Sequence, residues 1–181
     1  MTALSAHVLF DEATIFARVE ALAAEIAAKI PAERLDSLLA VTVLTGSFVF
    51  AADLLRALHR SGVAPEADFL QVGSYFEGTQ STGAVRLLRD IEAPVAGRDV
   101  LLIDDILESG RTLTYAKEQM LARGARRVWI VVALEKPNKR AVEIDADFVG
   151  FVCPDRFVVG YGMDLARNYR QLPFIGALDE G

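Results

Sequence analysis

The sequence predicts an α/β domain with a mostly parallel central sheet flanked by helices. Two observations lead to this fold class. Segments with helical periodicity alternate with strand-like segments along the chain. The strand-like segments are continuous apolar runs, which are typical of strands buried on both faces. Because the chain has 181 residues, 52% of them hydrophobic, we expect a single domain with a sizeable core over residues 1–181.

The first elements of the predicted domain are a helix, a strand and a second helix. Asp11 is a helix-capping residue type, and the segment 12–30 after it places apolar side chains at helical spacing, namely Ile15, Val19, Leu22, Ile26 and Ile30. The run LLAVTVL at 38–44 is short, apolar and rich in β-branched residues, which favours a buried strand. An amphipathic helix follows to about His59, and we expect Gly62 to end it.

The middle of the chain contains a second strand, a polar segment and a return strand. The strand is expected at 67–75 and its return at 84–88, where AVRLL alternates weakly. Between them, FEGTQSTG at 76–83 is polar and Gly-rich and has no periodicity, so we expect a mobile loop. Its composition suits a lid over a functional site, and it equally suits a surface loop with no role; composition alone does not decide between the two.

Three further apolar runs predict the remaining core strands, at 99–104, 127–134 and 147–153. A helix is expected from Thr112 to Arg123, with Gly124 at its end. Ligands of parallel sheets bind outside the carboxyl ends of the strands. The polar and glycine residues that follow these runs are therefore expected to converge on one edge of the sheet.

Composition excludes several classes of protein. The net charge of −6 argues against a nucleic-acid partner, which usually requires a basic face. Cys153 is the only cysteine, so no intramolecular disulfide is expected. The first residues lack a basic patch followed by an apolar core, as a signal peptide would have. No apolar run approaches the roughly 20 residues of a membrane helix, and we expect a cytoplasmic protein without a membrane partner.

A strand, a turn and a helix in the stretch VLLIDDILESGRTL predict an anion site. The apolar strand is followed by a tight turn through Ser109 and Gly110 and by a helix that starts near Arg111. Unpaired amides and the positive end of the helix dipole favour an anion at such a place. Ser109 and Thr112 add hydroxyl donors, so we expect the turn to bind a phosphate.

Two adjacent carboxylates, Asp104 and Asp105, stand beside this turn. A core strand has no use for neighbouring like charges, which points to binding. Carboxylates accept hydrogen bonds from sugar hydroxyls, or hold a Mg²⁺ that binds those hydroxyls. Phosphate donors next to hydroxyl acceptors suggest a ribose 5-phosphate.

Other readings of the motif fit less well. The chain has neither a Walker A loop nor a dinucleotide fingerprint after its first strand. A phospho-receiver domain also combines an acidic pair with a Lys-Pro, as at Lys136, but its acidic pair follows the first strand, whereas this pair lies in the middle of the chain. A mere helix cap would not require the apolar strand and the glycine turn together.

The stretch IDDILESGRTL resembles the phosphoribosyl pyrophosphate (PRPP) motif of type I phosphoribosyltransferases. Four further stretches, from about residue 38 onward, resemble the hypoxanthine-guanine phosphoribosyltransferases: VLTGSFVFAADLLRAL, SYFEGTQSTGAVRLLRD, ALEKPNKR and ADFVGFVCPDRFVVGYGMDLARNYRQLPFIGAL. The resemblance implies the type I phosphoribosyltransferase fold, with a core at about 36–155 and a small hood from about 1–35 and 156–181.

The resemblance also implies an activity. This family transfers the 5-phosphoribosyl group of PRPP to N9 of hypoxanthine or guanine with Mg²⁺, which gives IMP or GMP and pyrophosphate. A homodimer or homotetramer is implied as well. The resemblance places Lys136 at purine O6, and the chemistry of the side chain agrees: Lys136 can only donate hydrogen bonds, so it suits a carbonyl oxygen and favours hypoxanthine or guanine over adenine.

The resemblance assigns roles to residues by position. Glu108 would be the catalytic acid/base at purine N7. The residues implied for PRPP and its phosphates are Asp104, Asp105, Ser109, Gly110, Arg111, Thr112, Thr45, Gly46, Ser74, Tyr75 and Arg170. Those implied for the purine are Lys136, Phe157, Val158 and Asp164, and those implied for metal ions are Asp104, Asp105 and Asp164.

The chain departs from the family pattern at three positions. The family usually has Glu-Asp at Asp104–Asp105, an aspartate at Glu108, and often a basic residue at Thr45. Two alternatives stay open at this point. One is a transferase that accepts xanthine, although the backbone carbonyl of Val158 would repel its second carbonyl. The other is a non-catalytic regulator that senses PRPP or nucleotides with the same fold.

Overall fold

A computed structural model of the protein describes residues 6–77 and 80–178. Its main sheet has six strands in the order β4-β3-β2-β5-β6-β7. All neighbouring strands are parallel except β4, which pairs antiparallel with β3 at the edge. The predicted α/β class with a mostly parallel sheet is confirmed. The strands are β2 (Leu39–Leu44), β3 (Glu66–Glu77), β4 (Gln80–Arg89), β5 (Asp99–Leu107), β6 (Arg127–Glu135) and β7 (Phe148–Val152).

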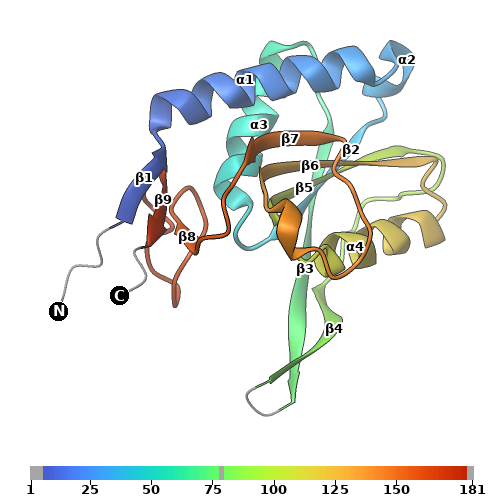
Figure 1. Cartoon of the computed structure of the whole chain (residues 1–181). Coiled ribbons are helices and arrows are strands. Elements are labelled where there is room, and N and C mark those ends of the chain that lie inside the picture. Colours follow the sequence, from blue (N-terminus) through green and yellow to red (C-terminus); the bar gives the residue numbers. More distant parts are fainter. Residues whose placement is uncertain (1–5, 78–79, 179–181) are drawn as a thin grey trace.

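Helices cover both faces of this sheet (Figure 1). On one face, α1 (Glu12–Lys29) and α3 (Phe48–Arg60) pack against alternate residues of the strands, such as Ala40. On the other face, α4 (Arg111–Ala122) packs against the intervening residues, such as Leu39 and Val41. The strands are therefore buried on both sides, which explains their continuous apolar runs.

Helix α1 begins and packs as the spacing of its apolar residues predicts. Asp11 caps it by accepting a hydrogen bond from the Thr14 amide at 2.8 Å. The five residues expected on one face are all buried. A short helix, α2 (Ala32–Leu35), joins α1 to β2, and a 3₁₀ helix, η1 (Pro137–Lys139), follows β6. Among the described residues, no helix has the length and apolarity needed to cross a membrane.

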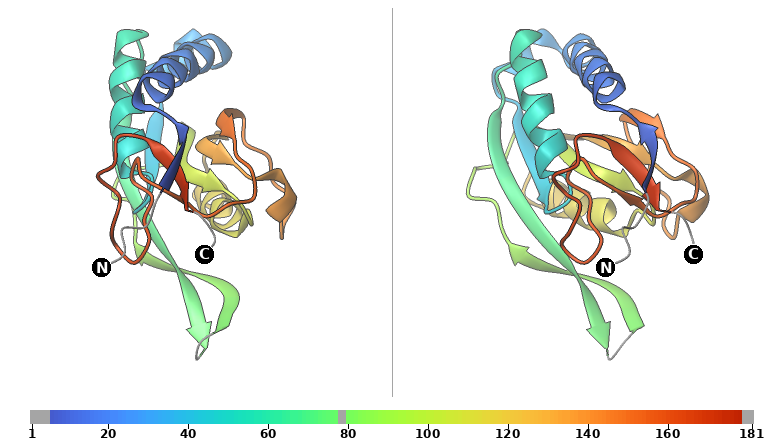
Figure 2. Two further views of the ribbon diagram at one scale, coloured as in Figure 1. Left: turned by 60° about the vertical axis from the view of Figure 1, so that its left-hand side comes forward. Right: turned by 90° about the vertical axis from the view of Figure 1, so that its left-hand side faces the viewer.

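The expected loop at 76–83 is wrong for most of its residues. Strands β3 and β4 continue through it, with Phe76 paired to Ser81 and Glu77 to Gln80, while residues 78–79 lie outside the described residues. The two strands form a long hairpin that projects from the sheet (Figure 2). Main-chain pairing needs no apolar side chains, so a polar sequence can form such an arm without any hydrophobic pattern.

Strand β3 is fastened to the connection after β4 by one carboxylate. Asp68 is 8% exposed and accepts hydrogen bonds from the amides of Phe69, Glu92 and Ala93 at 2.7–2.8 Å. Burial acts to raise the pKa of Asp68. The three amides, with Arg89 nearby, outweigh burial and hold the pKa below its ordinary value.

A second sheet joins the two ends of the described chain. Its three strands, in the order β1-β9-β8, are all antiparallel. They are β1 (Ala6–Phe10), β8 (Val158–Val159) and β9 (Ile175–Leu178), and Ala6 pairs with Leu178. The division into a core and a hood stays a prediction.

Candidate active site

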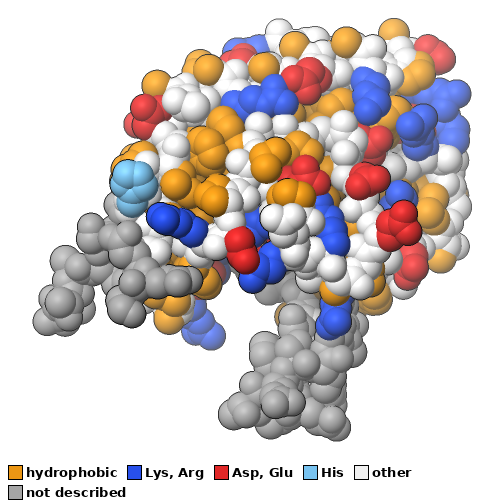
Figure 3. All heavy atoms as spheres, viewed as in Figure 1, with side chains coloured by type: hydrophobic (Ala, Val, Ile, Leu, Met, Phe, Trp, Pro, Cys, Tyr) orange, Lys and Arg blue, Asp and Glu red, His pale blue; other side chains and the backbone are white. Residues whose placement is uncertain are grey.

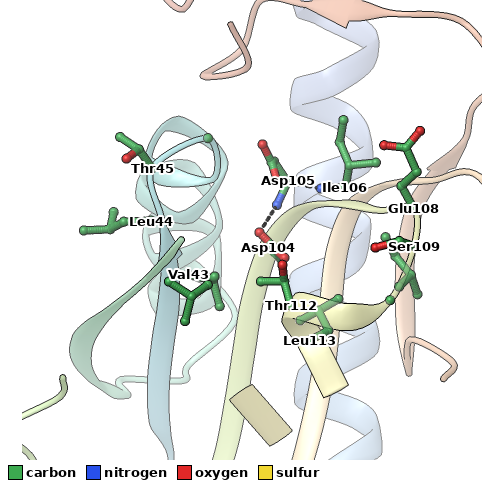
Figure 4. A pocket seen from close by; sticks show the side chains of 14 residues that line it. Val43, Leu44, Thr45, Asp104, Asp105, Ile106, Glu108, Ser109, Thr112 and Leu113 are labelled. Atoms are coloured by element: carbon green, nitrogen blue, oxygen red, sulfur yellow. Dashed lines mark hydrogen bonds between the residues drawn. The ribbon is translucent and has the colours of Figure 1, made fainter. Parts of the chain in front are cut away.

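The carboxyl ends of β2 and β5 border a cavity of about 320 Å³. Figure 4 shows Thr45, after β2, on one side of it, Glu108 and Ser109 on the other, and Asp104 and Asp105 between them. Many of the residues singled out from the sequence line this one cavity: Thr45, Gly46, Asp104, Asp105, Glu108, Ser109, Gly110 and Thr112. The local order of strand, turn and helix brings most of them together, and the parallel pairing of β2 with β5 adds the first two.

The two adjacent carboxylates lie within β5 itself. An oxygen of Asp104 accepts a hydrogen bond from the Asp105 amide at 3.0 Å, and an oxygen of Asp105 accepts one from the Ile106 amide at 2.8 Å. Burial, and then the neighbouring Asp105, raise the pKa of Asp104 well above its ordinary value. Burial also raises the pKa of Asp105, against the pull of the Arg170 charge. Because both carboxylates are buried side by side, a cation bound there would be favoured.

The turn between β5 and α4 has the form expected of an anion cradle. Gly110 has a φ of +82° and immediately precedes the first residue of α4. No side chain caps this helix end, and only a long contact of 3.4 Å joins the Arg111 amide to Ser109 Oγ. The side chain of Arg111 is exposed, whereas Thr112 lines the cavity. The helix end thus offers free backbone donors to an anion in the cavity.

The loop after β2 approaches the acidic pair closely. A Cβ added to Gly46 would collide with the carboxylate of Asp105, so a larger residue there would require that carboxylate to move. The peptide bond between Leu44 and Thr45 is cis. Gly162, from the carboxy-terminal segment, packs against the carbonyl of Gly46. The loop is therefore held between β5 and that segment.

Glu108 and Lys136 form an ion pair across the ends of β5 and β6. Their Oε1 and Nζ atoms are 3.4 Å apart, with the Lys136 side chain 8% and the Glu108 side chain 44% exposed. The amide of Lys136 donates to the Leu107 carbonyl at 3.0 Å, which holds the two strand ends in register. The residues that the resemblance implies for purine N7 (Glu108) and purine O6 (Lys136) are therefore in direct contact.

The carboxy-terminal segment supplies the remaining expected residues. Arg170 pairs with Asp164 at 2.7 Å and donates to the Gly162 carbonyl at 2.6 Å. Phe157 is half exposed, and Val158 is buried in β8. In the described parts of the chain, no three acidic, histidine or cysteine side chains are placed together to hold a metal ion. Asp164 therefore forms no common three-carboxylate cluster with the β5 pair.

Ser74 and Tyr75 lie in the projecting part of β3, where Ser74 pairs with Val85. Their side chains lie outside the described residues. A hydrogen bond that the sequence analysis did not predict joins α3 to the carboxy-terminal segment: the hydroxyl of Tyr161 donates to Asp53 on α3 at 2.9 Å. The two residues are 108 positions apart, and although each lies in a stretch that resembles the family, nothing in either stretch indicates that they pair.

Comparison with known proteins agrees with this geometry. Residues 8–165 match the family model described as the phosphoribosyl transferase domain. The chain is 44% identical over 172 residues to a hypoxanthine-guanine phosphoribosyltransferase of Bacillus subtilis, covering 94% of this chain and 92% of that one. A hypoxanthine phosphoribosyltransferase structure from Staphylococcus aureus superposes with a TM-score of 0.87 at 38% identity, over 96% of this chain and 91% of that one.

Another relative is much longer. The chain is 51% identical over 140 residues, 77% of its length, to the bifunctional protein TilS/HprT of Listeria monocytogenes, but spans only 21% of that protein. The match to the family model and the full-length match to the Bacillus subtilis enzyme confirm the resemblance. The chain belongs to the phosphoribosyltransferase family, on its hypoxanthine-guanine branch.

Proposed function

We propose that this protein is a purine salvage enzyme that transfers the 5-phosphoribosyl group of PRPP to N9 of hypoxanthine or guanine. One observation carries the proposal: the acidic pair, the glycine turn at the start of α4 and the Glu108–Lys136 pair gather at one edge of the sheet. These groups match, in order, a ribose, its 5-phosphate and a 6-oxopurine. The names of the relatives support the same reaction.

In this proposal the chain contacts each part of PRPP: the ribose, the 5-phosphate and the pyrophosphate. Asp104 and Asp105 accept hydrogen bonds from the ribose hydroxyls, and the turn at 108–112 donates to the 5-phosphate. The amide of Gly46 and the guanidinium of Arg170 face the pyrophosphate. Ser74 and Tyr75, on the projecting hairpin, would close over the site and exclude water.

The purine would lie against the carboxy-terminal segment. Phe157 stacks on its ring, the Val158 backbone pairs with its edge, and Lys136 donates to O6. As the bond from C1′ to pyrophosphate breaks and N9 bonds to C1′, the transition state resembles an oxocarbenium ion. Glu108 takes the proton from N7 as a general base, which leaves the nucleotide neutral at that position.

Mg²⁺ fits the acidic pair. This ion prefers oxygen ligands and commonly binds one or two carboxylates together with substrate phosphates and waters. Asp104 and Asp105 provide such oxygens. Their pKa values are raised chiefly by burial, which disfavours the charged carboxylates, and a bound cation would offset that cost. Asp164 would contribute to a second ion. When bound, Mg²⁺ neutralises charge on the leaving pyrophosphate.

The test is release of pyrophosphate from PRPP and Mg²⁺ with hypoxanthine, guanine, xanthine or adenine supplied separately. We expect turnover with the first two alone. Turnover with xanthine would contradict the reading of the Val158 backbone and favour a broader transferase. If no base supports turnover, the enzyme proposal fails and the nucleotide-sensing alternative replaces it.

The family resemblance supports two further proposals. We infer that the protein forms a homodimer or homotetramer, which light scattering of the purified chain would measure. We also infer that it acts in the cytoplasm, which cell fractionation would check.

Acidic and basic side chains are interspersed over the face shown in Figure 3, unlike the single basic stripe typical of nucleic-acid binders.

A further inference from the structure

A single arginine that the sequence did not single out bridges the two strand ends that carry Glu108 and Lys136. Nη1 of Arg140 lies 2.8 Å from the Leu107 carbonyl oxygen, 2.9 Å from that of Glu108 and 3.2 Å from that of Lys136. Its Nη2 lies 2.5 Å from a carboxylate oxygen of Glu135. One guanidinium thus contacts the backbones of both residues implied for the purine.

The bridge is largely shielded from water. The Arg140 side chain is 19% exposed and its partner Glu135 is 22% exposed. The next residue, Ala141, donates its amide to the Ser109 carbonyl at 2.9 Å, so the segment also reaches the phosphate turn. Hydrogen bonds from a charged donor in such a place are stronger than neutral ones, and unpaired carbonyls there would be costly.

We propose that Arg140 is a positioning residue of the purine site. Arg140 binds the backbone carbonyls of Glu108 and Lys136 with one rigid guanidinium. It thereby sets the positions at which the Glu108 carboxylate meets purine N7 and the Lys136 ammonium meets purine O6. This inference rests on the proposed function. Its physical basis is that Glu108 directly follows β5 and Lys136 directly follows β6, so the relative position of their side chains depends on the contacts that join the two strand ends.

The planar fork of arginine is what the bridge requires. Lysine keeps the positive charge but has a single ammonium group. That group cannot donate to Glu135 and to the backbone carbonyls at the same time. Arg140→Lys should therefore loosen the two ends without removing charge. Because a misplacement of about 1 Å at a reacting group costs on the order of 100-fold in rate, a small shift is enough to be measured.

The chain offers a matched control at the opposite end of the sheet. Arg98, just before β5, donates to the carbonyls of Ser37 at 2.9 Å, Pro94 at 3.2 Å and Leu38 at 3.5 Å, and pairs with Glu66 at 2.7 Å. Its side chain is 16% exposed. Arg98→Lys therefore removes an equivalent fork from the fold, far from the purine site.

The experiment compares Arg140→Lys with Arg98→Lys in melting temperature and in steady-state kinetics with hypoxanthine and PRPP. We expect Arg140→Lys to lower kcat/KM for hypoxanthine by about 10- to 100-fold, with KM for PRPP changed by less than about twofold. Arg98→Lys should lower the melting temperature comparably and leave both kinetic constants near wild type. Equal kinetic losses in the two variants would show a general stability effect and overturn the inference.

Two further variants separate positioning from folding. Glu135→Gln leaves the guanidinium in place but removes its anionic partner, and should give a smaller loss in the same direction. In a Lys136→Met background, Arg140→Lys should cost less than it does in the wild type, because the residue through which it acts is gone. Full additivity of the two changes would contradict the inference. A wild-type chain that is inactive with every 6-oxopurine would overturn the proposed function, and this inference with it.

Discussion

Gly110 permits the sharpest quantitative test of the phosphate turn. Its φ of +82° costs an alanine about 1–2 kcal/mol. An added Cβ would also lie 2.6 Å from a methyl of Ile144 and 3.0 Å from one of Val142. Overpacking of this kind costs about 1–3 kcal/mol more. Gly110→Ala should therefore lower the free energy of unfolding by about 2–5 kcal/mol in total.

Gly97→Ala is the matched control, because Gly97 has a φ of +74° and nothing within 4 Å of its added Cβ. Gly97→Ala should therefore lose stability only through the positive φ, without any steric clash. Urea unfolding of both variants isolates the packing cost of Gly110→Ala, which corresponds to a further drop in melting temperature of about 2–4 °C per kcal/mol for a chain of this size. KM for PRPP should rise only in Gly110→Ala. Equal stabilities and equal KM values would refute the packing argument.

Three other changes have defined outcomes. Asp68→Asn should lower stability by about 1–3 kcal/mol at pH 7, measured by urea unfolding. Because the folded-state pKa of Asp68 is depressed, its contribution is complete above the ordinary value and is lost as the pH falls through the lowered one. The difference in stability between variant and wild type should therefore shrink only at pH values below the ordinary pKa of an aspartate. Glu108→Gln should reduce kcat by roughly 10²- to 10⁴-fold in pyrophosphate release, and full turnover would exclude it as the base. Tyr161→Phe should cost about 0.5–1.5 kcal/mol in thermal unfolding through the lost bond to Asp53, and an unchanged melting temperature would contradict that role.

The parts of the fold that follow local patterns could be predicted from the sequence. Helix α1 has apolar residues at helical spacing and a capping aspartate, and the strands buried on both faces are continuous apolar runs. The turn proposed to bind phosphate is likewise local, since the strand, the turn and the helix are consecutive. Such features need no knowledge of which distant segments meet.

The parts that depend on distant contacts could not be predicted. The β3–β4 arm pairs through its main chain, so its polar sequence looked like a loop. Strand β8 has only two residues, and its partner β9 lies across an irregular segment. Arg140 and Tyr161 act through bonds that span tens of residues, to Leu107 and to Asp53. Neither the residue types nor their spacing in the sequence predicts such hydrogen bonds.

The order of strands in the small sheet has a consequence for biosynthesis. In the described part of the chain, no residue after Val152 belongs to the six-stranded sheet, so its core can assemble before the carboxy-terminal segment pairs. The middle strand of the small sheet, β9, comes last in the chain, yet both β1 and β8 pair with it. Phe157 and Val158 therefore acquire their final surroundings only after Leu178 has emerged. A folding chain would form the turn proposed to bind phosphate first and the wall proposed to face the purine at the end.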